Sequence, residues 1–248
     1  MSAFFHTFLY TPIYNLLILF ISLIPWGGMG LAVILVTIVI RLVLMPVSLA
    51  TARTQRAMQE IQPKLKELKE KYKDDKNLQA KETFALYKEH HINPFAGFAG
   101  IFIQLPILIG LYGVFRNKTL SVLNTTALYS FIPAPDSISM TFFGLFSLTT
   151  HSIFLALIAG IVQYFQARYT IPSPPPPNTG DKPSMQADFG RAMTMQMRYI
   201  LPVIITTVAY TSGAIALYFI TSGLFGIGES FLRKKKTTPE AELITAGI

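Results

Sequence analysis

Long stretches of this chain carry almost no charged residue, and short polar segments between them hold nearly all of its Lys, Arg, Asp and Glu. Most of the apolar stretches approach the roughly 20 residues that a helix needs to cross the hydrocarbon core of a bilayer. The pattern predicts an all-α integral membrane protein with five transmembrane helices, at residues 28–50, 94–115, 140–167, 199–211 and 212–232. The last two share one apolar run that is long for one helix and short for two, and Tyr210-Thr211-Ser212-Gly213 offers a turn between them.

Residues 1–27 are apolar and aromatic but lack the positive charge with which a secretory signal begins. Thr11-Pro12 and Pro25 interrupt this stretch, and the part between them is short for a span. We therefore predict an amino-terminal helix that lies in the outer interface of the membrane, followed by a turn at Pro25-Trp26-Gly27-Gly28. The alternative is an additional span, or one that is cleaved.

Residues 51–93 are rich in Lys, Arg, Asp and Glu. Apolar residues recur in this segment at three- and four-residue spacing, which is typical of an amphipathic helix: Met58, Ile61, Leu65 and Leu68. With Asp74-Asp75-Lys76-Asn77 as a polar turn, the segment predicts a helical hairpin, the alternative being a solvated charged loop. The other polar segments are a connector, a Pro-rich linker and a basic tail, at residues 116–139, 168–198 and 233–248.

The distribution of basic residues predicts the orientation, because cytoplasmic loops of membrane proteins carry an excess of Lys and Arg. The hairpin, the linker and the tail hold nearly all of these residues, whereas the connector holds Arg116 and Lys118. We therefore expect a multi-pass protein of the bacterial plasma (inner) membrane, with its amino terminus outside and its carboxyl terminus in the cytoplasm. The net charge of +8 then indicates anionic lipids first, with a ribosome as a further acidic partner and no sequence-specific binding of nucleic acid.

Composition narrows the possible chemistry. Hydrophobic residues make up 51% of the 248 residues and charged residues only 14%, against roughly 25% charged residues in soluble domains. The absence of cysteine excludes thiol catalysis, disulfides and cysteine metal sites. Phosphate-binding, nucleophile-elbow and zinc-protease motifs are missing, and the adjacent His90 and His91 would point different ways on a helix. We therefore expect neither an enzyme nor a cofactor or metal site, and we interpret His151 as a packed residue.

Arg41 is the most informative residue, because it is the only ionisable group in its span. Roughly 14 Å of helix separate it from the cytoplasmic end of that span. A charge at such a depth costs about 2.5–3.5 kcal/mol on insertion scales and usually faces a bundle interior or a water-filled cavity. The alternative is that the side chain reaches back to the headgroups, but the distance is too long for an Arg. We therefore predict an interior, hydrated guanidinium.

Polar residues of the spans are expected to face this charge, although Ser and Thr in such helices often bond only their own backbone. The candidates are Thr37, Gln104, Gln163, Gln166, Thr206, Thr207, Ser212 and Tyr218. Glu229 stands at the very end of the last span, so the sequence offers no carboxylate at the depth of Arg41. We therefore expect water around the guanidinium instead of a buried salt bridge.

The sequence resembles the YidC/Oxa/Alb membrane protein insertases in a series of short motifs. The order and spacing of these motifs cover residues 10–236. They are Thr37-Ile38-Val39-Ile40-Arg41-Leu42-Val43-Leu44-Met45-Pro46, Ile61-Gln62-Pro63-Lys64, Ala85-Leu86-Tyr87-Lys88, Ile92-Asn93-Pro94-Phe95, Gln104-Leu105-Pro106-Ile107, Leu201-Pro202-Val203, Ser212-Gly213 and Leu217-Tyr218.

The resemblance implies that the five helices surround a hydrophilic groove that contains Arg41, is open to the cytoplasm and the lipid, and is closed outside. Thr37 and Tyr218 match groove positions, and a polar residue of the third span matches either Gln163 or Gln166. It implies an insertase and chaperone that receives nascent membrane-protein segments and releases them laterally into lipid, alone, with a ribosome or beside the Sec translocon. The chain departs from the family in lacking the large extracytoplasmic domain and the lipoprotein cysteine of some members, and its short tail weakens the case for independent ribosome binding.

Two other functions are compatible with a membrane-embedded cation. A transporter or channel would use Arg41 to bind an anionic solute, but transporters often show repeated halves, and no internal repeat is visible here. A membrane-bound enzyme would need converging acid, base or metal-binding groups, and the spans offer only Arg41, His151 and scattered hydroxyls.

Overall fold

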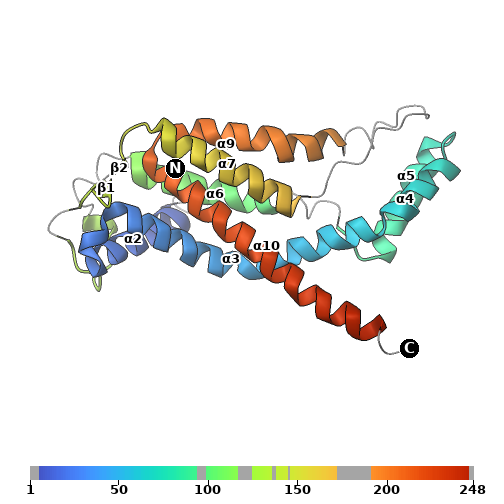
Figure 1. The fold of residues 1–248 in the computed structure, drawn as a ribbon, viewed down its shortest axis with the longest axis horizontal. Coiled ribbons are helices and arrows are strands. Elements are labelled where there is room, and N and C mark those ends of the chain that lie inside the picture. The colour runs from blue at the N-terminus through green and yellow to red at the C-terminus, as the bar shows by residue number, and fades with distance from the viewer. Residues whose placement is uncertain are drawn as a thin grey trace. The chain divides into compact units, whose positions relative to one another are not determined.

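The computed structural model describes residues 6–93, 99–116, 125–135, 138–144, 146–171 and 191–245. In this part of the chain the structure is mostly helical (Figure 1). Four of the described helices are long and apolar enough to cross a membrane: His6–Leu23, Gly28–Glu60, Arg191–Tyr210 and Gly213–Leu232. The chain divides into two compact units, one formed by residues 1–41 and 110–248 and the other by residues 42–109, and each is described by itself.

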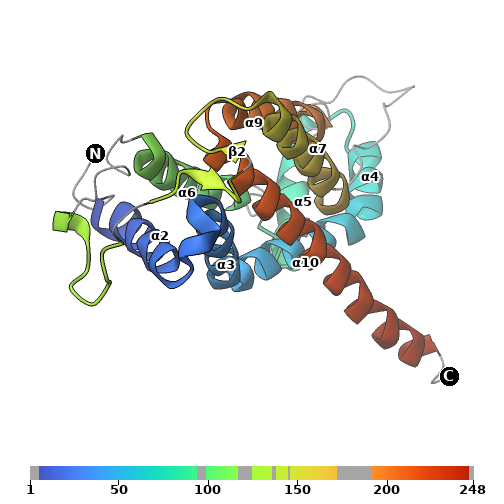
Figure 2. The same cartoon turned by 60° about the vertical axis from the view of Figure 1, so that its left-hand side comes forward.

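Three helices of the first unit pack side by side in Figures 1 and 2: α7 (Ile153–Thr170), α9 (Leu201–Tyr210) and α10 (Gly213–Thr245). A short π-helical turn, η6 (Gln196–Ile200), leads into α9, and Thr211 and Ser212 separate α9 from α10. Glycines allow the close approach of the helices, as small residues commonly do in membrane bundles. A Cβ added at Gly160 would overlap the side chain of Thr206, and one at Gly223 would lie 2.6 Å from Cγ1 of Val162.

Replacing Gly223 by Leu is expected to destabilise this bundle, because the new side chain has to displace Val162 and Gln163 at the contact between α7 and α10. Overpacking of this kind typically costs about 1–3 kcal/mol. Thermal unfolding of the purified protein in detergent should show a lower midpoint for Gly223→Leu. Gly228→Leu is the matched control, because a Cβ there would meet no atom within 4 Å. Equal midpoints for the two variants would contradict the assignment of a tight contact.

A small antiparallel hairpin connects the starts of two helices that are far apart in sequence. It consists of β1 (Thr141–Phe142) and β2 (Phe146–Ser147), with Thr141 paired to Ser147. The amide of Met29, at the start of α3 (Gly28–Glu60), donates to the carbonyl of Ser139 over 2.9 Å. The amide of Ala214, at the start of α10, donates to the carbonyl of Leu148 over 3.2 Å. The two helices therefore begin at the same hairpin.

The hairpin replaces the first part of the helix that the sequence predicts at residues 140–167. α7 begins only at Ile153, where the hydroxyl of Ser152 accepts a hydrogen bond from the amide of Leu155 over 3.3 Å. A capping Ser of this type ends the preceding extended chain and starts the helix. The apolar residues before it are therefore split between two strands and a turn, in which Phe143 and Gly144 both have positive φ angles.

The first predicted span is also longer than expected. α3 runs without interruption from Gly28 to Glu60, with Pro46 inside it, and so includes the first residues of the predicted hairpin segment. α6 (Ala99–Arg116) occupies most of the predicted second span, and residues 94–98 lie outside the described part of the chain.

The amino-terminal segment forms one continuous helical stretch, because the π-helical turn η1 (His6–Tyr10) leads directly into α2 (Thr11–Leu23). The predicted break at Thr11-Pro12 is therefore wrong: Pro12 lies in the first turn of α2, where a missing N–H is tolerated. A 3₁₀ turn, η2 (Pro25–Gly27), then leads into α3.

One side of α2 is held by the connector that follows α6. The amide of Asn15 donates to the carbonyl of Ala127, in the turn η5 (Thr125–Ala127), over 2.7 Å, and its oxygen accepts from the amide of Tyr129 over 2.7 Å. Two turns further along, the hydroxyl of Ser22 donates to the carbonyl of Pro133 over 2.8 Å. Asn15 is almost fully buried by these contacts.

The second unit contains two antiparallel helices, α4 (Gln62–Lys71) and α5 (Lys76–Glu89). Ile61, Leu65 and Ile92 form its buried apolar cluster. The carboxylate of Asp75 caps α5 by accepting from the amide of Leu78 over 2.9 Å. Tyr87 packs against this cluster, and burial raises the pKa of its phenol above the usual value.

Candidate functional site

Arg41 lies on α3 and reaches across to α10, where it donates to a buried hydroxyl. Its Nε is 2.9 Å from Oγ of Ser222, and its Nη2 donates to the same oxygen. Ser222 is fully buried, whereas Arg41 is partly exposed. At 1.5 Å per residue, Arg41 lies about 20 Å along α3 from Gly28, and Ser222 about 14 Å along α10 from Gly213. Both helices begin at the same β-hairpin, and the two residues meet roughly 14–20 Å along their helices from it.

Two of the predicted site residues lie one helical turn before this pair. Thr37 precedes Arg41 on α3 and is 1% exposed, and Tyr218 precedes Ser222 on α10 and is 2% exposed. The hydroxyl of Thr37 donates to the carbonyl of Val33 over 2.6 Å, which satisfies its polar group within its own helix. Thr37 and Arg41 therefore share one face of α3, Tyr218 and Ser222 share one face of α10, and the Arg41–Ser222 hydrogen bond joins the two helices.

The sequence did not distinguish between Gln163 and Gln166, and the structure places both on the side of α7 that faces α10. Gln163 is buried, and its Nε2 donates to the carbonyl of Phe219 over 2.8 Å, next to Tyr218 in the chain. Gln166 is partly buried, and its amide lies against Gly226. Gln163 thus fastens α7 to the backbone of α10 near the Arg41–Ser222 contact.

The remaining predicted residues are placed elsewhere. Thr207 is exposed on α9 and donates to the carbonyl of Val203, and Ser212 donates to the carbonyl of Leu148 at the β-hairpin. Thr206 packs at Gly160. Gln104 lies on α6 within the second unit and is partly buried. Contact of these residues with a substrate stays a prediction.

Ser222 was not singled out from the sequence, although a signal for it exists. It follows Tyr218 by four residues, as Arg41 follows Thr37, so that each pair occupies one helix face. Both pairs place the more polar residue further from the β-hairpin. Serines in apolar helices are common, however, and only the hydrogen bond from Arg41 distinguishes this one.

The histidines do not gather into a metal site. His151 packs against the ring of Tyr210 with 5.3 Å between centroids, and Nε2 of His90 lies 3.3 Å from Nζ of Lys64. Among the residues that the structure describes, no three His, Asp or Glu side chains are placed to hold a metal ion.

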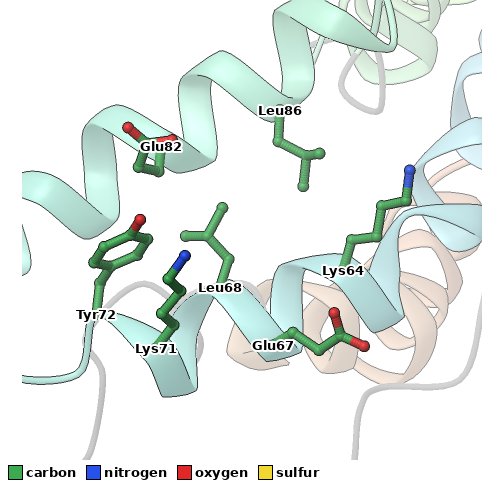
Figure 3. A pocket seen from close by; sticks show the side chains of 7 residues that line it. All are labelled: Lys64, Glu67, Leu68, Lys71, Tyr72, Glu82 and Leu86. Atoms are coloured by element: carbon green, nitrogen blue, oxygen red, sulfur yellow. The ribbon is translucent and has the colours of Figure 1, made fainter.

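The second unit has an open pocket between α4 and α5, with a volume of about 260 Å³. Figure 3 shows Leu68 and Leu86 facing each other across it, with charged side chains along the rim. The lining residues are Lys64, Glu67, Leu68, Lys71, Tyr72, Glu82 and Leu86. Two Leu side chains with charges of both signs around them can contact a polypeptide segment of mixed polarity.

Comparison with known proteins decides the family. A family model described as 60Kd inner membrane protein matches residues 20–240, which include Arg41, Ser222 and every helix from α3 to α9. The chain belongs to this family. The resemblance to YidC/Oxa/Alb insertases in the short motifs is thereby confirmed, and the protein is a multi-pass membrane protein of a bacterial inner-membrane insertase family.

Several insertases are similar to this family member along most of its length. The membrane protein insertase YidC of Fusobacterium nucleatum is 28% identical over 231 residues, which cover 90% of this chain and 98% of the relative. The membrane protein insertase MisCA of Bacillus subtilis is 33% identical over 235 residues, 91% of this chain and 79% of the relative. YidC of Clostridium tetani is 32% identical over 211 residues, 85% and 84% of the two chains.

Proposed function

We propose that this insertase receives nascent hydrophobic segments in a hydrophilic groove around Arg41, open to the cytoplasm, and releases them sideways into the lipid bilayer. The groove is proposed to include Thr37, Gln163, Gln166 and Tyr218 beside Arg41, whereas Gln104 stays a predicted groove residue on the family resemblance alone. Nascent membrane proteins are the substrates, and a ribosome or the Sec translocon can assist.

The observation that carries this proposal is the position of the Arg41 guanidinium. It donates to the hydroxyl of Ser222 on a second helix, yet its side chain remains partly exposed. An Arg guanidinium stays protonated in proteins, so this partly exposed side chain presents a positive charge that can attract anionic groups. A cation about 20 Å along an apolar helix offers a polypeptide with an acidic end a favourable position inside the membrane.

The proposed topology has five spans, α3, α6, α7, α9 and α10, with the amino terminus outside. The common start of α3 and α10 at the β-hairpin supports it, because both helices then run from one side of the membrane to the other in the same direction. The basic segments that follow them, residues 51–93 and 233–236, then share the cytoplasmic side, as the distribution of Lys and Arg in membrane proteins requires.

We propose that α2 lies at the outer interface, although the helix His6–Leu23 has the length and composition of a span. Asn15 and Ser22 bind carbonyls of the connector along two turns of α2. A spanning α2 would carry these connector residues with it into the hydrocarbon core, where exposed backbone groups are strongly disfavoured.

Insertion in this scheme needs no covalent step. The acidic or polar end of a substrate enters the groove from the cytoplasm and is attracted to Arg41. The membrane potential assists an acidic end by about 2.3 kcal/mol per charge per 100 mV. Transfer of the apolar segment into lipid then completes the reaction, with roughly 25 cal/mol gained for each Å² of apolar surface removed from water.

The hairpin formed by α4 and α5 is the proposed first contact for a nascent chain. Its pocket is lined by Leu68 and Leu86 together with Lys and Glu side chains. Its Lys residues would also hold it near anionic lipid headgroups, each contributing about 1 kcal/mol close to the membrane surface.

Site-directed photo-crosslinking tests the groove. A photoreactive amino acid at Gln104 or Gln166 should crosslink to a stalled, single-span nascent chain. The control position is Ile161, which is exposed on α7 and should crosslink only after the segment is released. Crosslinks from Ile161 that appear as early as those from Gln166, or uptake of anionic solutes by the purified protein in liposomes, would refute the groove proposal.

A further inference from the structure

Two aromatic rings project from neighbouring turns at the β-hairpin end of the first unit. Trp26, in η2, is 74% exposed, and Phe143, in the turn between β1 and β2, is 51% exposed. The rings stack on each other, with 6.4 Å between centroids and 30° between planes. They come from segments more than a hundred residues apart and are brought together by the fold. We call this pair, Trp26 and Phe143, the aromatic tip.

The segments that carry the tip pack closely against each other. Gly28, next to the η2 turn, has a φ angle of +56°, and a Cβ there would lie 2.9 Å from the carbonyl oxygen of Thr141. A Cβ at Gly30 would overlap the ring of Phe142, so the strand β1 packs directly on the first turn of α3. The turns that carry Trp26 and Phe143 therefore lie next to the first turn of α3.

The conformation of Phe143 is unfavourable in water. Its φ angle of 48° is left-handed, which costs a residue other than glycine about 1–2 kcal/mol. The same conformation exposes an aromatic side chain, which forgoes the burial energy of such a ring. Both costs are offset if the ring is removed from water when the protein is in its membrane.

Phospholipid is the environment that fits this tip. α3 begins two residues after Trp26, so the tip lies at the boundary of an apolar span. The described connector residues, 125–135 and 138–144, carry no charged side chain. Neutral Trp and other aromatic rings prefer the headgroup level of the bilayer. A stable protein interface would need about 800 Å² on each partner, far more than two ring faces supply.

We propose that the aromatic tip of Trp26 and Phe143 inserts into the headgroup region of the outer leaflet and thereby sets the depth of α3. Arg41 is then held about 20 Å inside this boundary, beyond the middle of a core that is about 30 Å thick. The importance of this depth rests on the proposed function of Arg41, whereas the lipid contact does not.

The lipid contact can be tested directly, because Trp26 is the only tryptophan of the chain. The purified protein is reconstituted into vesicles of phosphatidylcholine and phosphatidylglycerol whose acyl chains carry bromine either near the headgroup or near the chain end. Bromine near the headgroup should quench the Trp emission more strongly than bromine near the chain end. Quenching by aqueous iodide without quenching by bromine would overturn the proposal, as would protection from both quenchers, which would indicate a protein partner or a second copy.

Variants test the part played by Phe143. Phe143→Asp should weaken bromine quenching of Trp26 and increase iodide quenching, whereas Phe143→Tyr should retain the wild-type pattern. Phe84→Asp is the matched control, because Phe84 is 60% exposed but lies on α5, and it should leave both signals unchanged. If Phe143→Asp fails to fold, the comparison of the two bromine positions in the wild type still decides the lipid contact.

Depth is measured separately, by labelling a thiol introduced by Ile40→Cys into this cysteine-free chain. Phe143→Asp should change the rate of labelling by a maleimide added on the cytoplasmic side severalfold, and Phe84→Asp should not. An unchanged rate in Phe143→Asp would overturn the depth-setting role. Neither the quenching nor the labelling requires a substrate, so a failure of the groove proposal would be seen in the crosslinking alone.

Discussion

Replacing Arg41 by Glu is expected to abolish insertion of single-span substrates with acidic outer ends. At an effective dielectric constant of about 20, opposite charges 4 Å apart attract by about 4 kcal/mol, and like charges repel by as much. Since each 1.4 kcal/mol corresponds to a factor of about ten in rate, the reversal should slow insertion more than a hundredfold. The measurement is protease accessibility of the substrate's outer end in cells depleted of their own insertase and supplied with the variant.

Two further variants show whether charge or local structure is responsible. Arg41→Lys keeps the positive charge and should retain much of the activity. Ser222→Ala removes the hydroxyl that accepts from Nε but leaves the charge, and it should reduce insertion far less than Arg41→Glu. The amounts of all variants in the membrane are compared by immunoblotting. If Arg41→Glu at a normal level inserts these substrates as well as the wild type, the charge does not act as proposed.

Replacing Asn15 by Leu is expected to detach the connector from α2. The change leaves the buried carbonyl of Ala127 and the amide of Tyr129 without the side chain that binds them. The carbonyl of buried Ala127, left unsatisfied, costs about 1–3 kcal/mol. Ala127 is buried, so a thiol introduced by Ala127→Cys should react slowly with a maleimide in the parent protein. Asn15→Leu should speed this reaction at least tenfold.

Ser22→Ala provides a graded comparison on the same face of α2. It removes one hydrogen bond, to the carbonyl of Pro133, and should accelerate labelling much less, because a single hydrogen bond contributes about 0.5–1.5 kcal/mol. Equal labelling rates in the parent, Ser22→Ala and Asn15→Leu would mean that these contacts do not hold the connector.

The sequence predicts most of the helices because their signal is local. An apolar run of the right length indicates a span wherever charged residues flank it. The spacing of Ile61 and Leu65 indicates which face of the helical hairpin is buried. The bounds are harder to predict. α3 continues past Ala50 to Glu60 because the polar residues that follow are compatible with a helix, and only the break at Ile61, just before Pro63, ends the run.

The β-hairpin illustrates what a local pattern misses. Strands of two residues are too short to show an alternation of polar and apolar positions. Residues 140–152 contain no charged group, so they read as the beginning of an apolar helix. Only the contacts with the starts of α3 and α10 explain why they turn back before Ser152.

The candidate site is predictable only where its residues carry a local sequence signal. Arg41 is visible as a single charge in an apolar run, and Thr37 follows from helical spacing. Ser222 is 181 residues away, and no feature near Arg41 points to it. The sequence of α7 does not show that Gln163 is more buried than Gln166. Gln163 is buried because it packs against α10 and donates to the carbonyl of Phe219.

The separation of Arg41 and Ser222 along the sequence has a consequence for the synthesis of the protein. A ribosome that adds 5–20 residues per second needs on the order of ten to forty seconds to proceed from one residue to the other. During that interval α3 has emerged while its hydroxyl partner on α10 does not yet exist. Until Ser222 has been made, the guanidinium of Arg41 must therefore be hydrated or shielded by other groups. During its own synthesis, the insertase thus passes through a stage in which a polar group is at the membrane before its partner has been made.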